Sequence, residues 1–422
     1  MTIKIKSITF YYPTTLTGGA QYLFVRLANH LVNMGIKVYH IDYSYGFSRR
    51  FLNESVEKIN YVKNKKLNID FDTTLIVAPC QIFHLYNQLN LSAKVNLFFW
   101  CLHPYNFVGL FPFFSKVQNS NKTKIKLFVE KYYKKEYVLL KKIINELYDK
   151  KSLIFMDPAT YDCNKYLFDI KSDEKYYLPI PLMVVDFIPN SHIIDENCIN
   201  IGYLGNLVDF KISSILNLIQ NADLYSEKYN KKFKIHIIGR RDEQHILDEY
   251  KIKNNVEIIY KGILLEDELN NYLLNTIDIL FAMGTSCLEG AKLNIPSVVL
   301  DYSYNEFPMN YKFKWLFESK DYSLGDFVSD VKENKHNFED IINSIYIDKQ
   351  KKTIGEKCHN YFQTNHSINA VGDKLLEYLN EKSEINMNFF KNSGLYKTKI
   401  QYFELIWKGL SIIKTFLRLN KN

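Results

Sequence analysis

The sequence of 422 residues lacks the signatures of several protein classes. Its six cysteines, at positions 80, 101, 163, 198, 287 and 358, form no CxxC pair, and no histidine pair stands at ligand spacing. A structural zinc site is therefore not expected, and a reducing compartment is indicated. The sequence contains no run of 18 uncharged apolar residues, so no membrane-spanning helix is expected. The first residues, MTIKIKSITFYY, enter a strand-like run directly, so no signal peptide is expected.

The composition itself is that of a globular protein. Hydrophobic residues make up 47% of the chain and charged residues 24%. These fractions exclude a disordered, a collagen-like and a disulfide-stapled chain. The length predicts two or three domains.

Positive charge is concentrated in two segments. Segment 115–152 carries eleven lysines against four acidic residues, and segment 391–422 carries six lysines and one arginine against one glutamate. The formal net charge of the whole chain is +8, so the remainder is mildly acidic. Two basic segments in such a chain call for a negatively charged partner.

Both segments are also amphipathic. In the C-terminal one, apolar residues recur every three or four positions, at Ile400, Phe403, Trp407, Leu410, Ile413 and Leu417. The other follows the aromatic run FVGLFPFF (107–114). The pattern favours contact of 107–151 and 391–422 with an anionic membrane surface, although helices packed in the core with lysines on the wet face are an alternative. No nucleic-acid-binding pattern accompanies the charge.

Strand-like and helix-like runs alternate along the chain. Buried strands are expected at 4–11, 36–44, 72–79, 95–102 and 152–157, and again at 198–205, 233–239, 256–262, 277–284 and 297–303. Such continuous apolar strands between helices predict parallel α/β sheets. We expect two doubly wound, Rossmann-like domains, 1–185 and 191–382, facing across a cleft, and a basic amphipathic helical tail at 385–422.

The stretch 277–301 carries the most chemical information. A buried strand ends at Met283, and the small residues Gly284, Thr285 and Ser286 turn into a helix. Backbone N–H groups at the positive end of a helix dipole predict a phosphate site there. Glu289, one turn further, can accept hydrogen bonds from two ribose hydroxyls.

Two residues at strand ends of the first domain are candidate proton acceptors. His103 follows the strand 95–102, and its ordinary pKa lies near neutral pH, which suits a general base. Asp157, after the strand 152–157, is a second candidate.

The stretch 277–301 is similar to the nucleotide-binding loop of GT-B glycosyltransferases. Up to about residue 382 the chain resembles the bacterial group-1, family 4-like enzymes of surface-polysaccharide assembly, which make O-antigen, capsule or lipooligosaccharide. Gly18 and Gly19, in Thr-Gly-Gly-Ala (17–20), resemble the glycine loop that faces the donor or acceptor phosphate. Glu289 falls on the glutamate that holds the nucleotide ribose.

Residues 205–211 resemble the GRLxxxKG element that opens the second domain of that family. Gly205 matches its glycine, and Lys211 falls on its diphosphate-binding lysine. Asn206 replaces the arginine, for which Arg240 or Arg241 is expected to substitute. His103 resembles the histidine of the acceptor loop, although Pro104 replaces the aspartate that usually follows.

One further departure concerns the donor loop. Phe281 stands eight residues before Glu289, where the family usually has a second glutamate. The loop is also shorter, and in this it is more similar to inverting enzymes such as lipid A disaccharide synthase. The fold is expected to carry over, and the stereochemical outcome stays open.

The resemblance implies a glycosyltransferase that moves a sugar from a nucleotide diphosphate sugar to a hydroxyl of a lipid-linked glycan. It would be cytoplasmic and peripherally bound to the inner leaflet of the plasma membrane. His103, Lys211 and Glu289 are the expected catalytic residues. No metal and no other cofactor is expected, because the helix dipole and Lys211 would neutralise the leaving diphosphate. A nucleotide-sugar epimerase and an inactive scaffold of the same architecture are the alternatives.

Overall fold

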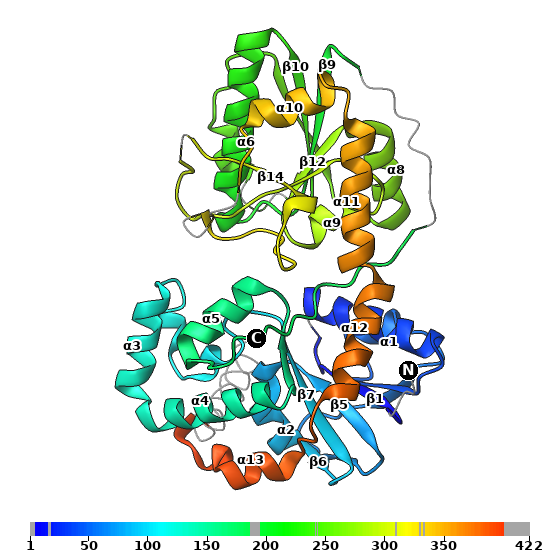
Figure 1. Ribbon diagram of the computed structural model, residues 1–422, viewed down its shortest axis with the longest axis vertical. Coiled ribbons are helices and arrows are strands. Elements are labelled where there is room, and N and C mark those ends of the chain that lie inside the picture. Colours follow the sequence, from blue (N-terminus) through cyan, green and yellow to red (C-terminus); the bar gives the residue numbers. More distant parts are fainter. Residues whose placement is uncertain are drawn as a thin grey trace, which may run out of the picture. The chain divides into compact units, whose positions relative to one another are not determined.

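The computed structural model divides the chain into two compact units. The first comprises Met1–Pro181 and Val371–Asn422, and the second comprises Leu182–Ala370. The residues that the structure describes are 5–15, 18–185, 195–240, 242, 244–308, 310–328, 331 and 334–400. Each unit is built around its own six-stranded sheet (Figure 1).

The sheet of the first unit is entirely parallel, with the order β3-β2-β1-β5-β7-β8. Its strands are β1 (Ile8–Tyr11), β2 (Val38–Asp42), β3 (Glu57–Asn60), β5 (Thr73–Val77), β7 (Val95–Cys101) and β8 (Leu153–Phe155). Every residue of β1, β2, β5 and β8 is buried. Burial on both faces explains why these strands are mostly apolar and do not alternate between apolar and polar residues. A separate two-stranded sheet pairs β4 (Leu67–Ile69) with β6 (Leu89–Leu91).

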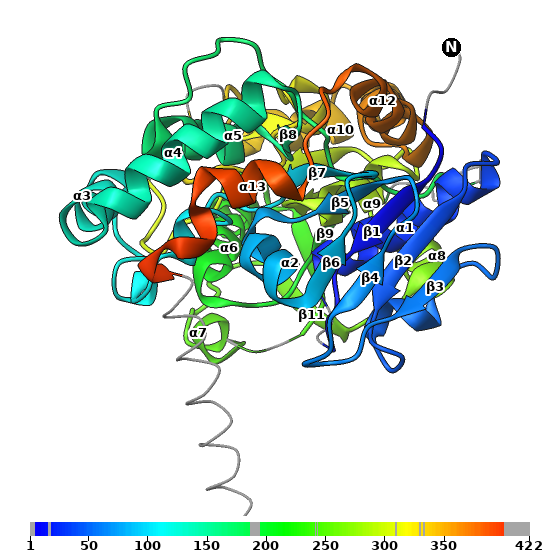
Figure 2. The same ribbon diagram turned by 90° about the horizontal axis from the view of Figure 1, so that it is seen from below.

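The helices of this unit are α1 (Gly19–Asn33), α2 (Ile82–Gln88), α3 (Lys122–Tyr132), α4 (Lys134–Asp149), α5 (Pro158–Phe168), α13 (Met387–Ser393) and most of α12 (Ile368–Glu381). Helices α4 and α5 contact β8, and α3 packs against both. Figures 1 and 2 both show α13 beside α4.

The sheet of the second unit has the order β11-β10-β9-β12-β13-β14, and its last pair is antiparallel. Its strands are β9 (Cys198–Leu204), β10 (Lys232–Ile238), β11 (Val256–Gly262), β12 (Ile279–Ala282), β13 (Ser297–Val299) and β14 (Lys314–Trp315). Its helices are α6 (Asp209–Tyr229), α7 (Gln244–Asp248), α8 (Glu266–Thr276), α9 (Thr285–Ala291), α10 (Phe338–Tyr346) and α11 (Lys351–Asn365).

Both sheets share one topology. In each, the first strand of the unit lies in the middle, two strands follow on one side and three on the other. This is the doubly wound Rossmann order, and its ligands bind outside the carboxyl ends of the strands where the order reverses. The switch points lie between β1 and β5 and between β9 and β12. The predicted pair of Rossmann-like domains is confirmed.

The expected end of the second domain at residue 382 is wrong, because the chain from Val371 onward belongs to the first unit. There the hydroxyl of Tyr378 donates to the carbonyl of Tyr177, and Lys151 Nζ lies 2.8 Å from a carboxylate oxygen of Glu381. Sequence reading missed this return because both partners lie about two hundred residues away along the chain.

The expected basic tail at 385–422 is corrected in its first part. Residues 385–400 pack into the first unit: Phe390 is fully buried against Phe99, and the ring of Tyr396 stacks on Tyr86 with centroids 4.1 Å apart. Ile400 is buried as well. The rest of the predicted amphipathic pattern, from 401 to 422, lies outside the described residues.

The aromatic run at 107–114 is likewise mostly core. Phe107, Phe111 and Phe114 are buried, and Phe113 is exposed. These residues therefore follow the alternative of core packing, whereas the helices after them keep an exposed basic face. None of the helices in the described part of the chain is long and apolar enough to span a membrane.

Candidate functional site

The residues predicted for donor binding gather at the switch point of the second sheet. The last residues of β9 and β12, Leu204 and Ala282, are paired neighbours. Gly205 therefore begins the loop on one side of the switch point, and Gly284 lies in the turn on the other. The sequence placed both loops correctly because each follows an unmistakable buried strand.

The loop after β9 is tied to the loop after β10 by backbone contacts. The N–H of Gly205 donates to Ile238 O at 2.9 Å, and that of Leu207 donates to Arg240 O at 2.9 Å. Asn206 Oδ1 accepts the N–H of Arg240 at 3.0 Å. Asn206 thus holds the two loops together.

The side chain of Arg240 is exposed and contacts a neighbouring carboxylate. It is 58% exposed and lies 3.6 Å from a carboxylate oxygen of Asp242. Arg241 lies outside the described residues. Substitution of either arginine for the one missing at Asn206 stays a prediction.

Lys211, in the first turn of α6, is the cation of this loop. A Cβ on Gly205 would lie 3.5 Å from its Nζ, so the ammonium sits beside the loop backbone. Desolvation lowers the pKa of Lys211. No carboxylate among the described residues forms an ion pair with it. A partly dehydrated cation beside a glycine backbone is suited to an anionic ligand.

The turn into α9 leaves part of its backbone donors without a side-chain cap. Gly284 has a φ of +61°, and no side chain caps the helix. The N–H of Gly284 donates to Leu324 O at 2.7 Å, so its predicted use as a phosphate donor is wrong. Thr285 and Ser286 form its half-buried first turn. A Cβ on Gly290 would lie 2.6 Å from Leu280 Cδ2 and 2.7 Å from Ser297 Oγ, so α9 packs directly on β12 and β13. The helix start is therefore held firmly at the sheet edge.

Glu289 already has a partner on its own helix. Its carboxylate forms an ion pair with Lys292, and both side chains are largely buried. The (i, i+3) spacing makes this pairing visible in the sequence, but its burial is not. Its assignment to ribose binding stays a prediction, in which the hydroxyls compete with Lys292 for the carboxylate.

The position of the missing second glutamate is filled by core. Phe281 is fully buried and packs edge-on against Phe313, with centroids 5.6 Å apart, and against Phe338. Its side chain therefore lies on the core side of β12. The departure noted in the sequence is a packing feature, and no carboxylate replaces the glutamate at this position.

Gly18 and Gly19 lie at the start of α1, after the loop that follows β1. Gly18 is the N-cap residue of α1, in extended conformation, and no side chain caps that helix. A Cβ on Gly19 would meet nothing within 4 Å. Internal packing therefore does not require a glycine at 19, and contact of Gly18 and Gly19 with a phosphate or substrate stays a prediction. Thr17 lies outside the described residues.

Sequence reading missed a carboxylate that organises this edge. Asp42, at the end of β2, is fully buried and accepts backbone N–H groups from Thr14, Tyr43 and Ser48. Burial is the main influence on its carboxyl group and raises the pKa of Asp42. A Cβ on Gly46 would overlap that carboxylate, at 2.3 Å. The aspartate at a strand end, with a glycine four residues later, is the signal that could have revealed it.

His103 follows β7 on an exposed turn. Its Nδ1 accepts the N–H of Tyr105 at 3.1 Å, and Asn106 Oδ1 accepts the N–H of His103 itself. Partial desolvation lowers the pKa of His103, which favours the neutral ring. With Nδ1 occupied as an acceptor, the neutral ring carries its proton on Nε2. This arrangement suits donation to a substrate oxygen better than proton abstraction, and the catalytic role of His103 stays a prediction.

Asp157 has a structural task. Its carboxylate caps α5 by accepting the N–H of Thr160 at 2.7 Å. A capping carboxylate satisfies a donor of the helix terminus that otherwise has no partner in the helix. The strand-end aspartate is therefore explained without a catalytic role.

Comparison with known proteins gives the fold. No family model and no curated protein matches the sequence. The crystal structure of a glycosyltransferase from Rickettsia africae ESF-5 is 13% identical, covers 90% of this chain and 99% of its own, and has a TM-score of 0.52. The apo form of the lipopolysaccharide outer core galactosyltransferase WaaB is 9% identical, covers 88% and 99%, and has a TM-score of 0.50. This chain has the GT-B fold.

The GT-B assignment confirms the resemblance read from the donor loop at the level of the fold. In the terms of that fold, β9 to β14 form the Rossmann-like sheet with the predicted donor loops, and β1, β2, β3, β5, β7 and β8 form the sheet with the predicted acceptor loops. The likeness concerns the fold alone and assigns no role to any site residue.

Proposed function

We propose that this protein is a glycosyltransferase that transfers a sugar from a nucleotide diphosphate sugar to a hydroxyl of a lipid-linked glycan. The observation that carries the proposal is Lys211, a partly desolvated ammonium at the switch point of the second sheet with no carboxylate partner among the described residues. The likeness to solved glycosyltransferase structures supports the proposal at the level of the fold. One of the similar structures is a lipopolysaccharide outer core galactosyltransferase, WaaB, which supports the proposal of a lipid-linked acceptor.

In the proposed reaction the bond between the anomeric carbon and the β-phosphate oxygen breaks, and a bond to the acceptor oxygen forms. The diphosphate leaves with the bonding electrons, while the acceptor hydroxyl loses its proton to a base. Lys211 and the backbone N–H groups of Thr285 and Ser286 would stabilise the charge that builds on the diphosphate. Glu289 would hold the ribose.

The proposal also covers the location of the protein in the cell. The exposed lysines of α3 and α4 and the basic residues of 401–422 suit an anionic lipid surface, and the acceptor is itself membrane-bound. We therefore place the protein in the cytoplasm, bound peripherally to the inner leaflet.

Thermal stabilisation by UDP, GDP, CMP and their sugar conjugates tests the donor site. Binding to the folded state must raise the unfolding temperature. We expect a shift with one nucleotide that is lost in Lys211→Met. The matched control is Lys228→Met, at the far end of the same helix, where the lysine pairs with Glu339 instead. No shift with any nucleotide would favour the inactive scaffold, and turnover of the sugar nucleotide without an acceptor would favour the epimerase.

A further inference from the structure

The residues that follow β13 reach across the switch point of the second sheet. Strand β12 lies between β9 and β13, so one strand separates the end of β13 from the loop after β9. The backbone N–H of Ser303 nevertheless donates to the carbonyl of Phe210, in the first turn of α6, at 3.1 Å. Residues 302–304 therefore pass the end of β12 and meet the start of α6, where Lys211 directly follows Phe210.

Three aromatic side chains gather at this crossing. The ring centroid of Phe210 lies 5.9 Å from that of Tyr302 and 6.2 Å from that of Tyr304. Tyr304 is 57% exposed, and the other two residues are half-buried. We call these three residues the aromatic wall. Large rings that stay accessible at the sheet edge where ligands bind are typical of a binding surface rather than of core packing.

The aromatic wall stands directly beside the predicted diphosphate site. Lys211 Nζ lies 5.7 Å from the centroid of the Phe210 ring. A group attached to a phosphate on this ammonium therefore has the wall within its reach. The wall itself carries no charge and offers only two hydroxyls, those of Tyr302 and Tyr304, so it suits a neutral group that combines an apolar face with hydroxyls.

A buried carboxylate fixes the backbone that carries the two tyrosines. Asp301 is fully buried, and it accepts the N–H of Asp326 at 2.8 Å and the hydroxyl of Tyr311 at 2.6 Å. The N–H of Tyr302 in turn donates to the carbonyl of Asp326 at 3.0 Å. The base of the aromatic wall is thus held in place before any ligand arrives, which reduces the ordering cost of binding.

We infer that the aromatic wall binds the sugar of the nucleotide diphosphate sugar, with the apolar C–H face of a pyranose packed against the rings. The inference rests on the proposed transferase function and names the residues that select the sugar. The occupant is the sugar rather than the nucleobase, because Glu289, the predicted ribose ligand, belongs to α9, whereas the wall adjoins Lys211 at the start of α6. The diphosphate separates these two halves of the donor.

Titration calorimetry of the full chain separates a contact with the sugar from a contact with the nucleotide. The probes are UDP with UDP-glucose and UDP-galactose, and GDP with GDP-mannose. We expect Tyr304→Ala to weaken binding of the sugar conjugate about three- to tenfold and to leave affinity for the parent nucleotide unchanged. Tyr304→Phe keeps the ring and should keep the affinity for both.

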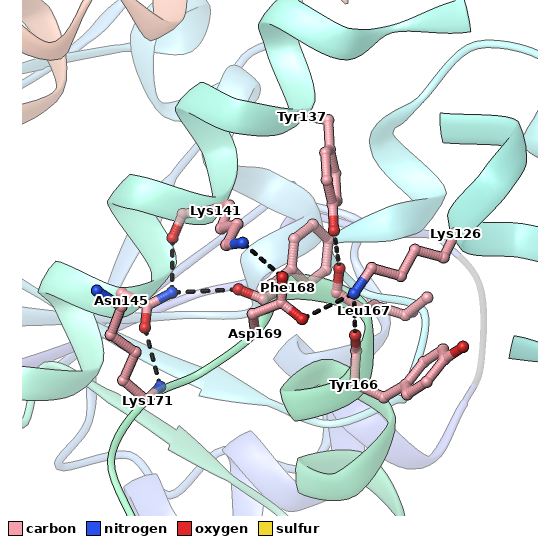
Figure 3. Close-up of polar contacts among 9 residues, drawn as sticks. All are labelled: Lys126, Tyr137, Lys141, Asn145, Tyr166, Leu167, Phe168, Asp169 and Lys171. Atoms are coloured by element: carbon pink, nitrogen blue, oxygen red, sulfur yellow. Dashed lines mark hydrogen bonds and ion pairs between the residues drawn. The ribbon is translucent and has the colours of Figure 1, made fainter. Parts of the chain in front are cut away.

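A second variant and a matched control complete the test. Phe210→Leu should show the same selective loss as Tyr304→Ala. The control is Tyr166→Ala, in the first unit: Tyr166 is 42% exposed, and Lys126 Nζ lies 5.1 Å from the centroid of its ring (Figure 3). This substitution removes the same kind of exposed ring beside a lysine and should change neither affinity.

Two results would overturn the inference while the transferase proposal stands. Equal losses for the nucleotide and its sugar conjugate in Tyr304→Ala would place the aromatic wall against the nucleotide. Unchanged affinity for the conjugate in both Tyr304→Ala and Phe210→Leu would remove the sugar from the wall. Failure of the wild type to bind either nucleotide would overturn the transferase proposal itself, and the inference with it.

Discussion

A Cβ atom on Gly239 would lie 2.2 Å from the carbonyl oxygen of Gly205. Both glycines have backbone angles that side chains rarely tolerate, with φ values of +146° and +153°. The loops that follow β9 and β10 therefore touch backbone to backbone. This contact fixes the position of the loop that carries Asn206 and leads to Lys211.

Gly239→Ala should disturb this loop more than it disturbs the fold. The methyl group must push the Gly205 carbonyl away, at a cost of roughly 1–3 kcal/mol in the free energy of unfolding. We expect nucleotide affinity, measured by calorimetry, to fall at least tenfold. Gly35→Ala is the control: Gly35 also has a positive φ, but its Cβ would meet nothing within 4 Å, so affinity should stay unchanged. Wild-type affinity in Gly239→Ala would remove the loop from the binding site.

The pH dependence of stability should reveal the state of Lys211. Burial lowers the pKa of Lys211 in the folded protein below its ordinary value of 10.5. At a pH between the lowered pKa and 10.5, the unfolded chain binds the proton and the folded chain does not. Stability must then rise with pH across that window, and below it the folded state bears the full desolvation cost. Lys211→Met should therefore be more stable than the wild type at pH 7, with the difference shrinking toward pH 10 in urea denaturation. A pH-independent difference would contradict the assignment.

The sequence predicts the two sheets well because the central strands are buried on both faces. The run LFFWC (97–101) in β7, for example, has no polar interruption and is fully buried. The edge strand β3, with the sequence EKIN, is mostly exposed and was missed. Edge strands of this kind look like loops, since half of their surroundings is water.

Some of the site residues can likewise be predicted from the sequence, and others cannot. Gly205 and Gly284 are predictable because each follows a buried strand, and strand ends of one sheet meet at one edge. The role of Asn206 in bridging two loops depends on a contact that no local pattern encodes, and the (i, i+3) spacing of Glu289 and Lys292 does not reveal that their ion pair is largely buried. The position of residues 385–400 was missed for the same reason.

Glu289→Gln should weaken nucleotide binding by roughly 1–3 kcal/mol, because a charged acceptor of ribose hydroxyls is lost. Lys292 competes for that carboxylate in the free protein, so Lys292→Met should strengthen binding or leave it unchanged. Titration calorimetry with the nucleotide found by thermal shift measures both. Identical affinities for Glu289→Gln and the wild type would exclude a ribose contact.

For His103, two substitutions separate donation from proton abstraction. Glutamine can place an N–H donor near the position of Nε2, whereas alanine cannot. If His103 donates, His103→Gln should keep most of the transferase rate, and His103→Ala should lose about 10²-fold. Equal losses in both variants, with disappearance of the acidic limb of the pH–rate profile, would instead identify His103 as the base.

The core of the second unit contains an ion pair that the site depends on indirectly. Asp278, just before β12, is fully buried, and its Oδ1 lies 2.7 Å from Nζ of Lys351 on α11. The hydroxyl of Tyr346 and the N–H of Asn200 donate to the other oxygen. These contacts join the start of β12 to α10 and α11, and β12 leads into the predicted donor loop.

Lys351→Met should destabilise the protein by about 3–5 kcal/mol, because it leaves the buried carboxylate of Asp278 without its cation. The neighbouring Lys352 is the matched control: its side chain is 89% exposed, and it lies 4.0 Å from Glu356. Lys352→Met should change stability by less than about 0.5 kcal/mol. Urea denaturation measures both, and the double variant Asp278→Asn/Lys351→Met should recover part of the loss, since it removes the stranded charge. Equal effects at 351 and 352 would mean that the buried pair contributes no more than a surface contact.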